Sequence, residues 1–115
     1  MRGAFVLGVI AGLAAACSPD PTGGSVDGAK IYDGMCTSCH GPTGHPSEQM
    51  IQQLNVRDLT SPELRAKATP EFVEAQVRRG STNKLMPSFQ GALTEDQIKA
   101  VSAYVASPAF LKRSK

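Results

Sequence analysis

Apolar and polar positions repeat at helical spacing in several short stretches of this chain. Apolar residues fall three to four positions apart over 26–38, more weakly over 47–54, and again from 94 to near Pro108. No stretch alternates convincingly with a period of two, as a half-buried strand would. The pattern predicts an all-α domain of three to four short helices separated by long loops.

Helix start and stop signals divide the second half of the chain more finely. A hydroxyl residue, a proline and an acidic residue follow one another at 61–63 and again at 69–71, an order typical of helix starts. Gly80 marks the end of the second of these helices, and Thr94 with Gln97 fits a capping box. The irregular segments in between are long for so small a domain, which is typical of loops with a function.

The N-terminal part has a different composition. Met1 and Arg2 precede an almost entirely apolar or glycine run over 4–16, the layout of a secretory signal, and the run is shorter than the roughly 20 residues of a spanning helix. A buried N-terminal helix is the alternative, which the glycines disfavour. We expect a signal peptide over 1–16, a flexible tether over 17–25, the folded domain over 26–108 and a basic tail over 109–115.

Charge and composition narrow the choice of partners. The formal net charge of +2 falls to +1 once Arg2 leaves with the signal, and no Lys/Arg run with interleaved aromatic residues occurs, so nucleic acid is not an expected partner. Aromatic residues make up 5% of the chain and Trp is absent. A domain of about a hundred residues with so thin a core would gain stability from a large apolar cofactor.

The cysteines carry the strongest chemical signal. Cys17 directly follows the apolar run, whereas Cys36 and Cys39 form the close pair of Cys36-Thr37-Ser38-Cys39-His40. Cys-x-x-Cys-His is the haem-attachment pattern, in which two thiols form thioethers with haem vinyl groups and the adjacent histidine coordinates the iron. The pattern predicts one covalently bound haem c, held by Cys36 and Cys39 with His40 as an axial ligand.

Two other uses of the cysteine pair are weaker. A zinc site needs four ligands, and only His40 and His45 are available beyond the pair. A thioredoxin-like redox pair belongs to a βαβ context, whereas this chain shows no strand pattern.

Met86 is the expected ligand opposite His40. It precedes Pro87, whose fixed backbone angle and missing N–H suit a stiff loop pressed against an apolar ring. Met50 is the rival methionine, but it lies on the amphipathic stretch over 47–54, where methionine is more often core filling. His45 follows His40 by five residues, which leaves little chain to turn around the ring, so a surface role is expected.

Several segments resemble the small bacterial class I cytochromes c. The similarity runs from about Gly28 to Ser107 and is carried by Gly28-Ala29-Lys30-Ile31-Tyr32, the segment 36–41, Leu85-Met86-Pro87-Ser88-Phe89 and the last helix over 100–106. The resemblance implies an all-α class I fold around one haem, with the first and last helices crossing at Gly28 beside Tyr32 and Tyr104. It also implies an exposed haem edge, with Arg78, Arg79 and Lys84 as candidates for that rim.

An iron held by His40 and Met86 has no open coordination position. Such a site suits a single-electron carrier between respiratory redox partners, and no other catalytic pattern indicates an enzyme. The alternative is a haem-based ligand sensor or peroxidase-like protein, which would need Met86 to be easily displaced. We expect a monomer that exchanges electrons with membrane or periplasmic redox proteins.

Cys17 is a candidate for lipid modification. The segment Leu13-Ala14-Ala15-Ala16-Cys17 resembles a bacterial lipoprotein signal, although the larger aliphatic residue stands one place early. Ordinary signal cleavage after Ala16 is the alternative. Lipid at Cys17 would explain the odd thiol and the tether together, and it predicts an exported protein anchored to a membrane on the periplasmic side.

Overall fold

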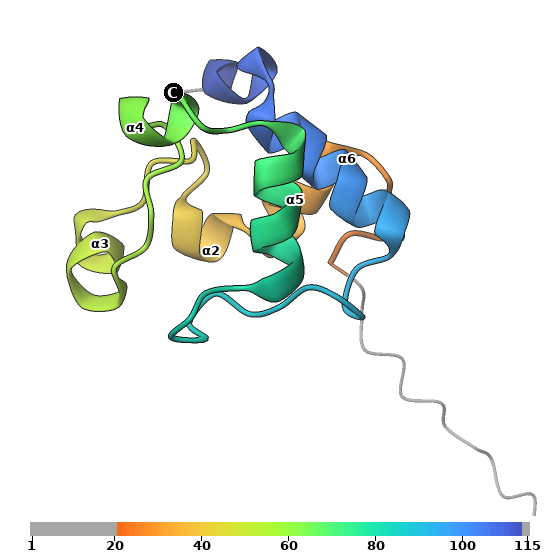
Figure 1. The fold of residues 1–115 in the computed structure, drawn as a ribbon, viewed down its shortest axis with the longest axis horizontal. Coiled ribbons are helices and arrows are strands. Elements are labelled where there is room, and N and C mark those ends of the chain that lie inside the picture. The colour runs from red at the N-terminus through yellow and green to blue at the C-terminus, as the bar shows by residue number, and fades with distance from the viewer. Residues whose placement is uncertain (1–20, 114–115) are drawn as a thin grey trace, which may run out of the picture.

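The computed structural model describes residues 21–113, and within them every regular element is helical. The helices follow one another as α1 Gly28–Met35, α2 Thr37–His40, α3 Glu48–Leu54, α4 Pro62–Arg65, α5 Pro70–Arg79, α6 Glu95–Ala106 and the 3-10 helix η1 Pro108–Lys112 (Figure 1). In this part of the chain Gln90 and Leu93 form an isolated bridge and no strand forms. The all-α prediction is confirmed. The helices outnumber the three to four expected because α2 and α4 are single turns of four residues.

The first predicted helix, over 26–38, is two helices in the structure. The Asp27 carboxylate accepts hydrogen bonds from the backbone N–H groups of Ala29 and Lys30, which starts α1 at Gly28. At Cys36 the backbone leaves the ideal helical angles, with φ −118° and ψ −28°, and this departure ends α1 and begins α2. The break separates the turn Thr37–His40, which carries the predicted haem-attachment motif, from the helix that packs in the core.

The capping signals of the second half of the chain are confirmed. Ser61 and Thr69 each accept a hydrogen bond from a backbone N–H in the first turn of α4 and α5. Thr94 and Gln97 form a complete capping box at the start of α6. Gly80 ends α5 with φ +72°, a value that favours glycine.

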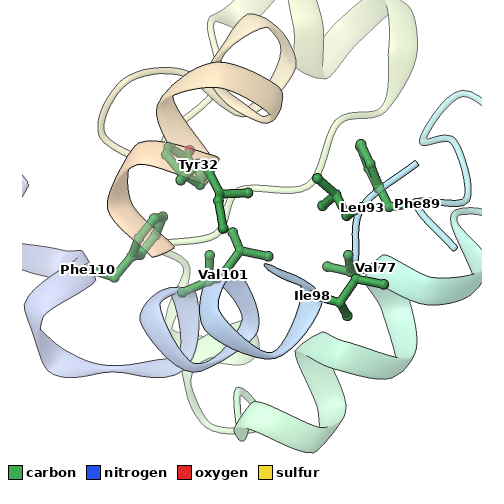
Figure 2. Packing of buried hydrophobic residues seen from close by; sticks show 9 residues of the cluster. Tyr32, Val77, Phe89, Leu93, Ile98, Val101 and Phe110 are labelled. Atoms are coloured by element: carbon green, nitrogen blue, oxygen red, sulfur yellow. The ribbon is translucent and has the colours of Figure 1, made fainter. Parts of the chain in front are cut away.

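Helix α6 is the centre of the core, because it packs against both α5 and α1. Ile98 and Val101 of α6 lie in one buried cluster with Tyr32 of α1 and Val77 of α5, as Figure 2 shows. Phe89, from the loop that follows α5, closes one end of this cluster. The core therefore joins helices from both ends of the domain.

The crossing of α1 and α6 depends on Gly28. A Cβ at this position would lie 2.4 Å from the carbonyl oxygen of Ala100 and 2.5 Å from the Cβ of Tyr104. Only glycine allows the two helices to approach this closely. The expected crossing at Gly28 is confirmed.

The domain extends further toward the C-terminus than the predicted boundary at residue 108. Phe110 is fully buried, and its ring lies edge-on to Tyr32 at 5.0 Å and to Tyr104 at 5.7 Å between centroids. Arg113 stacks over the Tyr32 ring at 4.5 Å and donates a hydrogen bond to the Tyr104 hydroxyl. Residues 109–113 are therefore part of the packed fold rather than a tail.

The expected flexible tether over 17–25 is also partly packed. Thr22 is 7% exposed, and the Gln97 side chain donates hydrogen bonds to the Thr22 hydroxyl and to the carbonyl of Ser25. Residues 21–25 therefore dock against the start of α6.

Cys17 and the expected signal peptide over 1–16 lie outside the described residues. No helix among residues 21–113 is both long and apolar enough to cross a membrane.

Candidate cofactor site

A cavity of about 450 Å³ opens between α2, α5, the segment that follows α3 and the loop that follows α5. Its volume falls in the range of about 300–1,000 Å³ that small-molecule and cofactor sites occupy. Buried apolar side chains from the core form its inner wall, namely Tyr32, Leu64, Val77, Phe89, Val101 and Val105. Cys36, Cys39, His40 and Met86, which lie up to 50 positions apart in the chain, all line this one cavity.

The turn that carries the predicted haem-attachment motif is held at the cavity wall by two hydrogen bonds. The Tyr32 hydroxyl donates a hydrogen bond of 2.7 Å to the carbonyl of Gly41, and the Thr37 hydroxyl donates one of 2.9 Å to the carbonyl of Asp33. These bonds tie α2 and the residue after it to α1. Both Cys36 and Cys39 are free thiols that line the cavity. Burial, helped by the neighbouring Cys39, raises the pKa of the Cys36 thiol to about 11, so this group is neutral near pH 7.

His40 is oriented by a backbone carbonyl. Its Nδ1 lies 3.0 Å from the carbonyl oxygen of Arg57, in the segment that follows α3. Because a carbonyl can only accept, the Nδ1 of His40 carries the proton and donates this bond, which leaves the lone pair on Nε2. Burial lowers the pKa of His40 and so favours the neutral ring. A neutral imidazole with Nε2 unprotonated is the form that ligates a metal.

Met86 sits at the end of a closed loop. The Met86 N–H donates to the Ser81 hydroxyl at 3.0 Å, and the Ser81 N–H donates to the Met86 carbonyl at 2.9 Å. Gly80 makes room for this arrangement, since a Cβ there would lie 2.4 Å from the Met86 carbonyl oxygen. The loop therefore fixes the backbone of Met86 against the C-terminal end of α5.

The rival ligands are placed elsewhere. Met50 lies on α3 and His45 in the loop before it, and neither lines the cavity. The His45 ring instead pairs with the Asp58 carboxylate at 2.8 Å. No group of three or more histidine, cysteine or acidic residues within residues 21–113 is arranged to hold a metal ion, which leaves the zinc alternative without support.

The three basic residues suggested for the rim differ in their positions. Arg79 lines the cavity, whereas Arg78 and Lys84 do not. Arg78 lies between the carboxylates of Glu74, at 2.5 Å, and Glu95, at 2.7 Å.

The sequence analysis missed two groups that position the predicted axial ligands. The carbonyl of Arg57 orients His40, and no side-chain pattern marks a backbone acceptor 17 residues away. Ser81 closes the Met86 loop, and its place just after the helix-ending Gly80 was the available signal.

The residues at the cavity fit a covalently bound haem. Two thiols three residues apart on one turn can be joined to vinyl groups, a neutral imidazole offers Nε2, and Met86 offers a thioether. The apolar inner wall suits the body of a porphyrin ring.

Comparisons with known proteins show what the whole chain is similar to. Residues 26–105 match the family model described as cytochrome c oxidase, cbb3-type, subunit III. Cytochrome c6 of Nostoc sp. is 36% identical over 104 residues, which cover 90% of this chain and 88% of that protein. Cytochrome c6 of Leptolyngbya boryana is 34% identical over 82 residues, covering 71% of this chain and 89% of that protein.

A solved structure shows the same likeness. The KustC0563 c-type cytochrome superposes with a TM-score of 0.61 at 31% identity, covering 70% of this chain and 94% of that one. The family model spans well over half of the chain, and the cytochromes c6 are matched along most of their length. The chain therefore belongs to the small class I cytochromes c, electron-transfer proteins that bind haem c covalently.

Proposed function

We propose that this protein carries single electrons on one haem attached to Cys36 and Cys39 and ligated axially by His40 and Met86. The observation that supports the assignment is that these four residues, from α2 and from the loop after α5, line one cavity of cofactor size. Neither Met50 nor His45 reaches that cavity, so neither competes for the same position.

The surroundings suit electron transfer without substrate binding. Haem iron with one imidazole and one thioether ligand exchanges single electrons at a raised reduction potential and has no vacant ligand position. The apolar inner wall disfavours the more highly charged oxidised site, which raises the potential further. The Arg57 carbonyl keeps the His40 ring in one orientation, so little rearrangement accompanies a change of charge.

The same geometry works against a ligand sensor or peroxidase-like role. Either role would require Met86 to swing away from the iron. The Met86 N–H and the Met86 carbonyl are both hydrogen-bonded to Ser81, and Gly80 packs closely against the Met86 carbonyl. These contacts hold the Met86 backbone in place. A displaceable ligand would be expected on a loosely held loop.

Replacing Met86 by leucine should open the iron. Leucine has a similar volume but no sulfur, so the loop should keep its fold while the axial bond is lost. We expect the weak long-wavelength absorption band of the ferric iron–sulfur bond to disappear and the reduced protein to bind carbon monoxide. Absorption spectra with and without carbon monoxide measure both effects. Met50→Leu is the matched control and should leave both spectra unchanged, whereas the reverse result would assign the ligand to α3.

The cellular setting belongs to the same proposal. We infer an exported protein on the periplasmic side, anchored to a membrane by lipid at Cys17, that exchanges electrons as a monomer with membrane or periplasmic redox proteins. The apolar run over 4–16 and the position of Cys17 directly after it support export and anchoring. Residues 21–25 dock on the domain, so only Ser18–Asp20 would separate the lipid from the folded protein. Four Cα steps span at most about 14 Å, which would keep the domain close to the membrane surface.

Changing Cys17 to serine should release the protein from the membrane. The thiol is the only site for the lipid in this proposal, and without acyl chains the domain has no apolar anchor. We expect native protein in the membrane fraction and the Cys17→Ser protein in the soluble periplasmic fraction, each loaded with haem. Cell fractionation with mass spectrometry of the N-terminus measures this. An unmodified Cys17 on soluble native protein would contradict the anchor and leave the haem assignment untouched.

A further inference from the structure

The two histidines of the chain make hydrogen bonds to two consecutive residues of one segment. The Nδ1 of His40 lies 3.0 Å from the carbonyl oxygen of Arg57, and the Nδ1 of His45 lies 2.8 Å from the carboxylate of Asp58, the next residue. His40 ends α2, and His45 lies in the loop that follows it. This loop and the segment that follows α3 run side by side (Figure 1). The two hydrogen bonds are therefore neighbouring links between the same two segments.

The segment after α3 has no regular structure where it carries the Arg57 carbonyl. Residues 55–58 belong to no helix, so no helical hydrogen-bond ladder fixes the direction of this carbonyl. Further along, the backbone N–H of Leu59 donates a bond of 2.9 Å to the carbonyl of Gly44, in the loop after α2. The direction of the Arg57 carbonyl therefore depends on what holds its neighbours in the chain.

Asp58 is the neighbour with the most direct control. The carbonyl of Arg57 and the backbone N and Cα of Asp58 belong to one planar peptide unit, so a displacement of this Cα turns the carbonyl. Both oxygens of the Asp58 carboxylate are held: Oδ2 pairs with His45, and Oδ1 accepts bonds from the Thr60 N–H at 2.8 Å and from the Thr60 hydroxyl at 2.6 Å. The Asp58 side chain therefore fixes one end of the peptide unit whose oxygen receives the bond from His40.

The Asp58 carboxyl is charged in this arrangement. Partial burial acts to raise the pKa of Asp58, but hydrogen bonds from Thr60 and His45 outweigh burial and lower this pKa below its usual range. An ionised carboxylate only accepts hydrogen bonds, so the Nδ1 of His45 carries the proton and donates. The bond can therefore form with a neutral as well as with a charged His45 ring.

His45 is in turn held close to the turn that carries His40. A Cβ at Gly41, the residue after His40, would lie 2.5 Å from the carbonyl oxygen of His45, so the two backbones are in contact. Arg113 is the other charged residue that lines the surface hollow beside His45, and it pairs with Asp33. Asp58 is thus the carboxylate that serves His45.

We propose that His45 and Asp58 are positioning residues for the axial histidine, because their bond holds the Arg57 carbonyl in the direction that receives the Nδ1–H of His40. This inference rests on the proposed ligation of the haem iron by His40. A hydrogen bond donated from Nδ1 makes an imidazole a more basic metal ligand. A more basic ligand favours ferric over ferrous iron, so the pair lowers the reduction potential, whereas the apolar inner wall raises it.

A surface ion pair without influence on the site is the competing interpretation. The His45 side chain is 61% exposed, and exposed ion pairs contribute little to stability. Positioning is better supported, because the pair joins the residue directly after the acceptor Arg57 to the loop directly after the donor His40. The two interpretations differ in whether loss of the pair reaches the iron.

The test is the reduction potential of haem-loaded His45→Ala at about pH 8.5. Histidine side chains ordinarily change charge between about pH 5 and 8, so at this pH the variant removes a hydrogen bond without removing a charge. We expect the potential to rise. The ratio of ferrous to ferric protein at a fixed applied potential should increase by up to about tenfold, the smaller of the effects usual for groups that orient a metal ligand.

Nuclear magnetic resonance of the reduced protein reports on the hydrogen bond itself. In His45→Ala the Nδ1–H of His40 should exchange with solvent faster than in the native protein, because its bond to the Arg57 carbonyl is weaker. His45→Asn is the conservative variant, since it offers an amide N–H on an atom attached to Cγ, as Nδ1 is. It should restore the native potential and most of the native protection of the His40 proton.

Asp58→Asn removes the same bond from the other side and should also raise the potential. This change removes a negative charge as well, so it needs a charge control. Glu95→Gln is the matched control, because the Glu95 side chain is 62% exposed and lies 2.7 Å from Arg78, in an ion pair that contacts neither histidine. It should leave the potential and the exchange of the His40 proton unchanged.

Two results would overturn the inference. A native potential together with native exchange of the His40 proton in His45→Ala would leave His45 and Asp58 as an ordinary surface ion pair. Equal shifts of the potential in Asp58→Asn and Glu95→Gln, with none in His45→Ala, would assign the effect to charge alone. Failure of the proposed function is visible before any variant is compared, as native protein without haem or with His40 ring signals that show no bond to iron.

Discussion

Replacing both Cys36 and Cys39 by serine is expected to yield a chain without covalent haem and with little stable tertiary structure. Among residues 21–113 the two thiols are the only cysteines that line the cavity, and serine cannot form a thioether to a vinyl group. The single variants should each keep haem through the remaining thiol in reduced yield. The double variant should release all of its haem on acid–acetone extraction, whereas native protein should retain it.

The loss of structure follows from the size of the cavity. An unfilled cavity is destabilising because the side chains that line it lose packing contacts, and six buried core side chains line this cavity of about 450 Å³. The whole unfolding free energy of a small domain is about 5–15 kcal/mol. Because so small a margin can be lost when the group that fills the cavity is missing, the double variant should melt without a cooperative transition. Circular dichroism during heating measures this.

The control for both effects is Ser38→Ala, inside the same turn. Ser38 is exposed and does not line the cavity, so this variant should keep covalent haem and a native melting curve. Native haem content in the double variant would contradict attachment through these cysteines. Cooperative native-like melting of a haem-free chain would show that the cofactor adds little to the core.

The helix boundaries that the sequence predicted well are those with local signals. Ser61, Thr69, Thr94 and Gly80 act within one turn of their own position, so their neighbours in the chain decide the outcome. The break at Cys36 was missed because no breaking residue marks it.

In the candidate site, too, the features with local sequence signals were predicted and the others were not. Cys36, Cys39 and His40 follow from a short motif, and the choice of Met86 over Met50 followed from Pro87. That both ends of this set line one cavity depends on the packing of α5 against α6, which no local pattern encodes.

The predicted domain bounds of 26–108 were too narrow at both ends, for a related reason. Composition at 17–25 and charge at 112–115 suggest mobile segments, yet Thr22 and Phe110 are buried by contacts with residues more than 70 positions away. One small or aromatic residue in a polar stretch is a weak sequence signal. Its burial depends on whether the folded domain has a matching surface, here the surface of α1 and α6.

Phe110→Ala should destabilise the domain by about 3–5 kcal/mol, the usual cost of removing a buried phenylalanine ring. The ring is fully buried and lies edge-on to Tyr32 and Tyr104, and Tyr32 lines the cofactor cavity. Removing it should therefore lower the melting temperature and weaken the α1–α6 crossing next to the haem-attachment turn.

The neighbouring Leu111 provides the control for Phe110. Its side chain is 46% exposed and in the same 3-10 helix, so Leu111→Ala should cost less than about 1 kcal/mol. Denaturant unfolding of the haem-loaded variants, followed by far-ultraviolet circular dichroism, compares the two losses directly. Equal and small losses would mean that residues 109–113 are a tail after all, as their charge suggests. A large loss for Phe110→Ala alone would place the C-terminal segment in the core, where it supports the helix crossing on which the haem site depends.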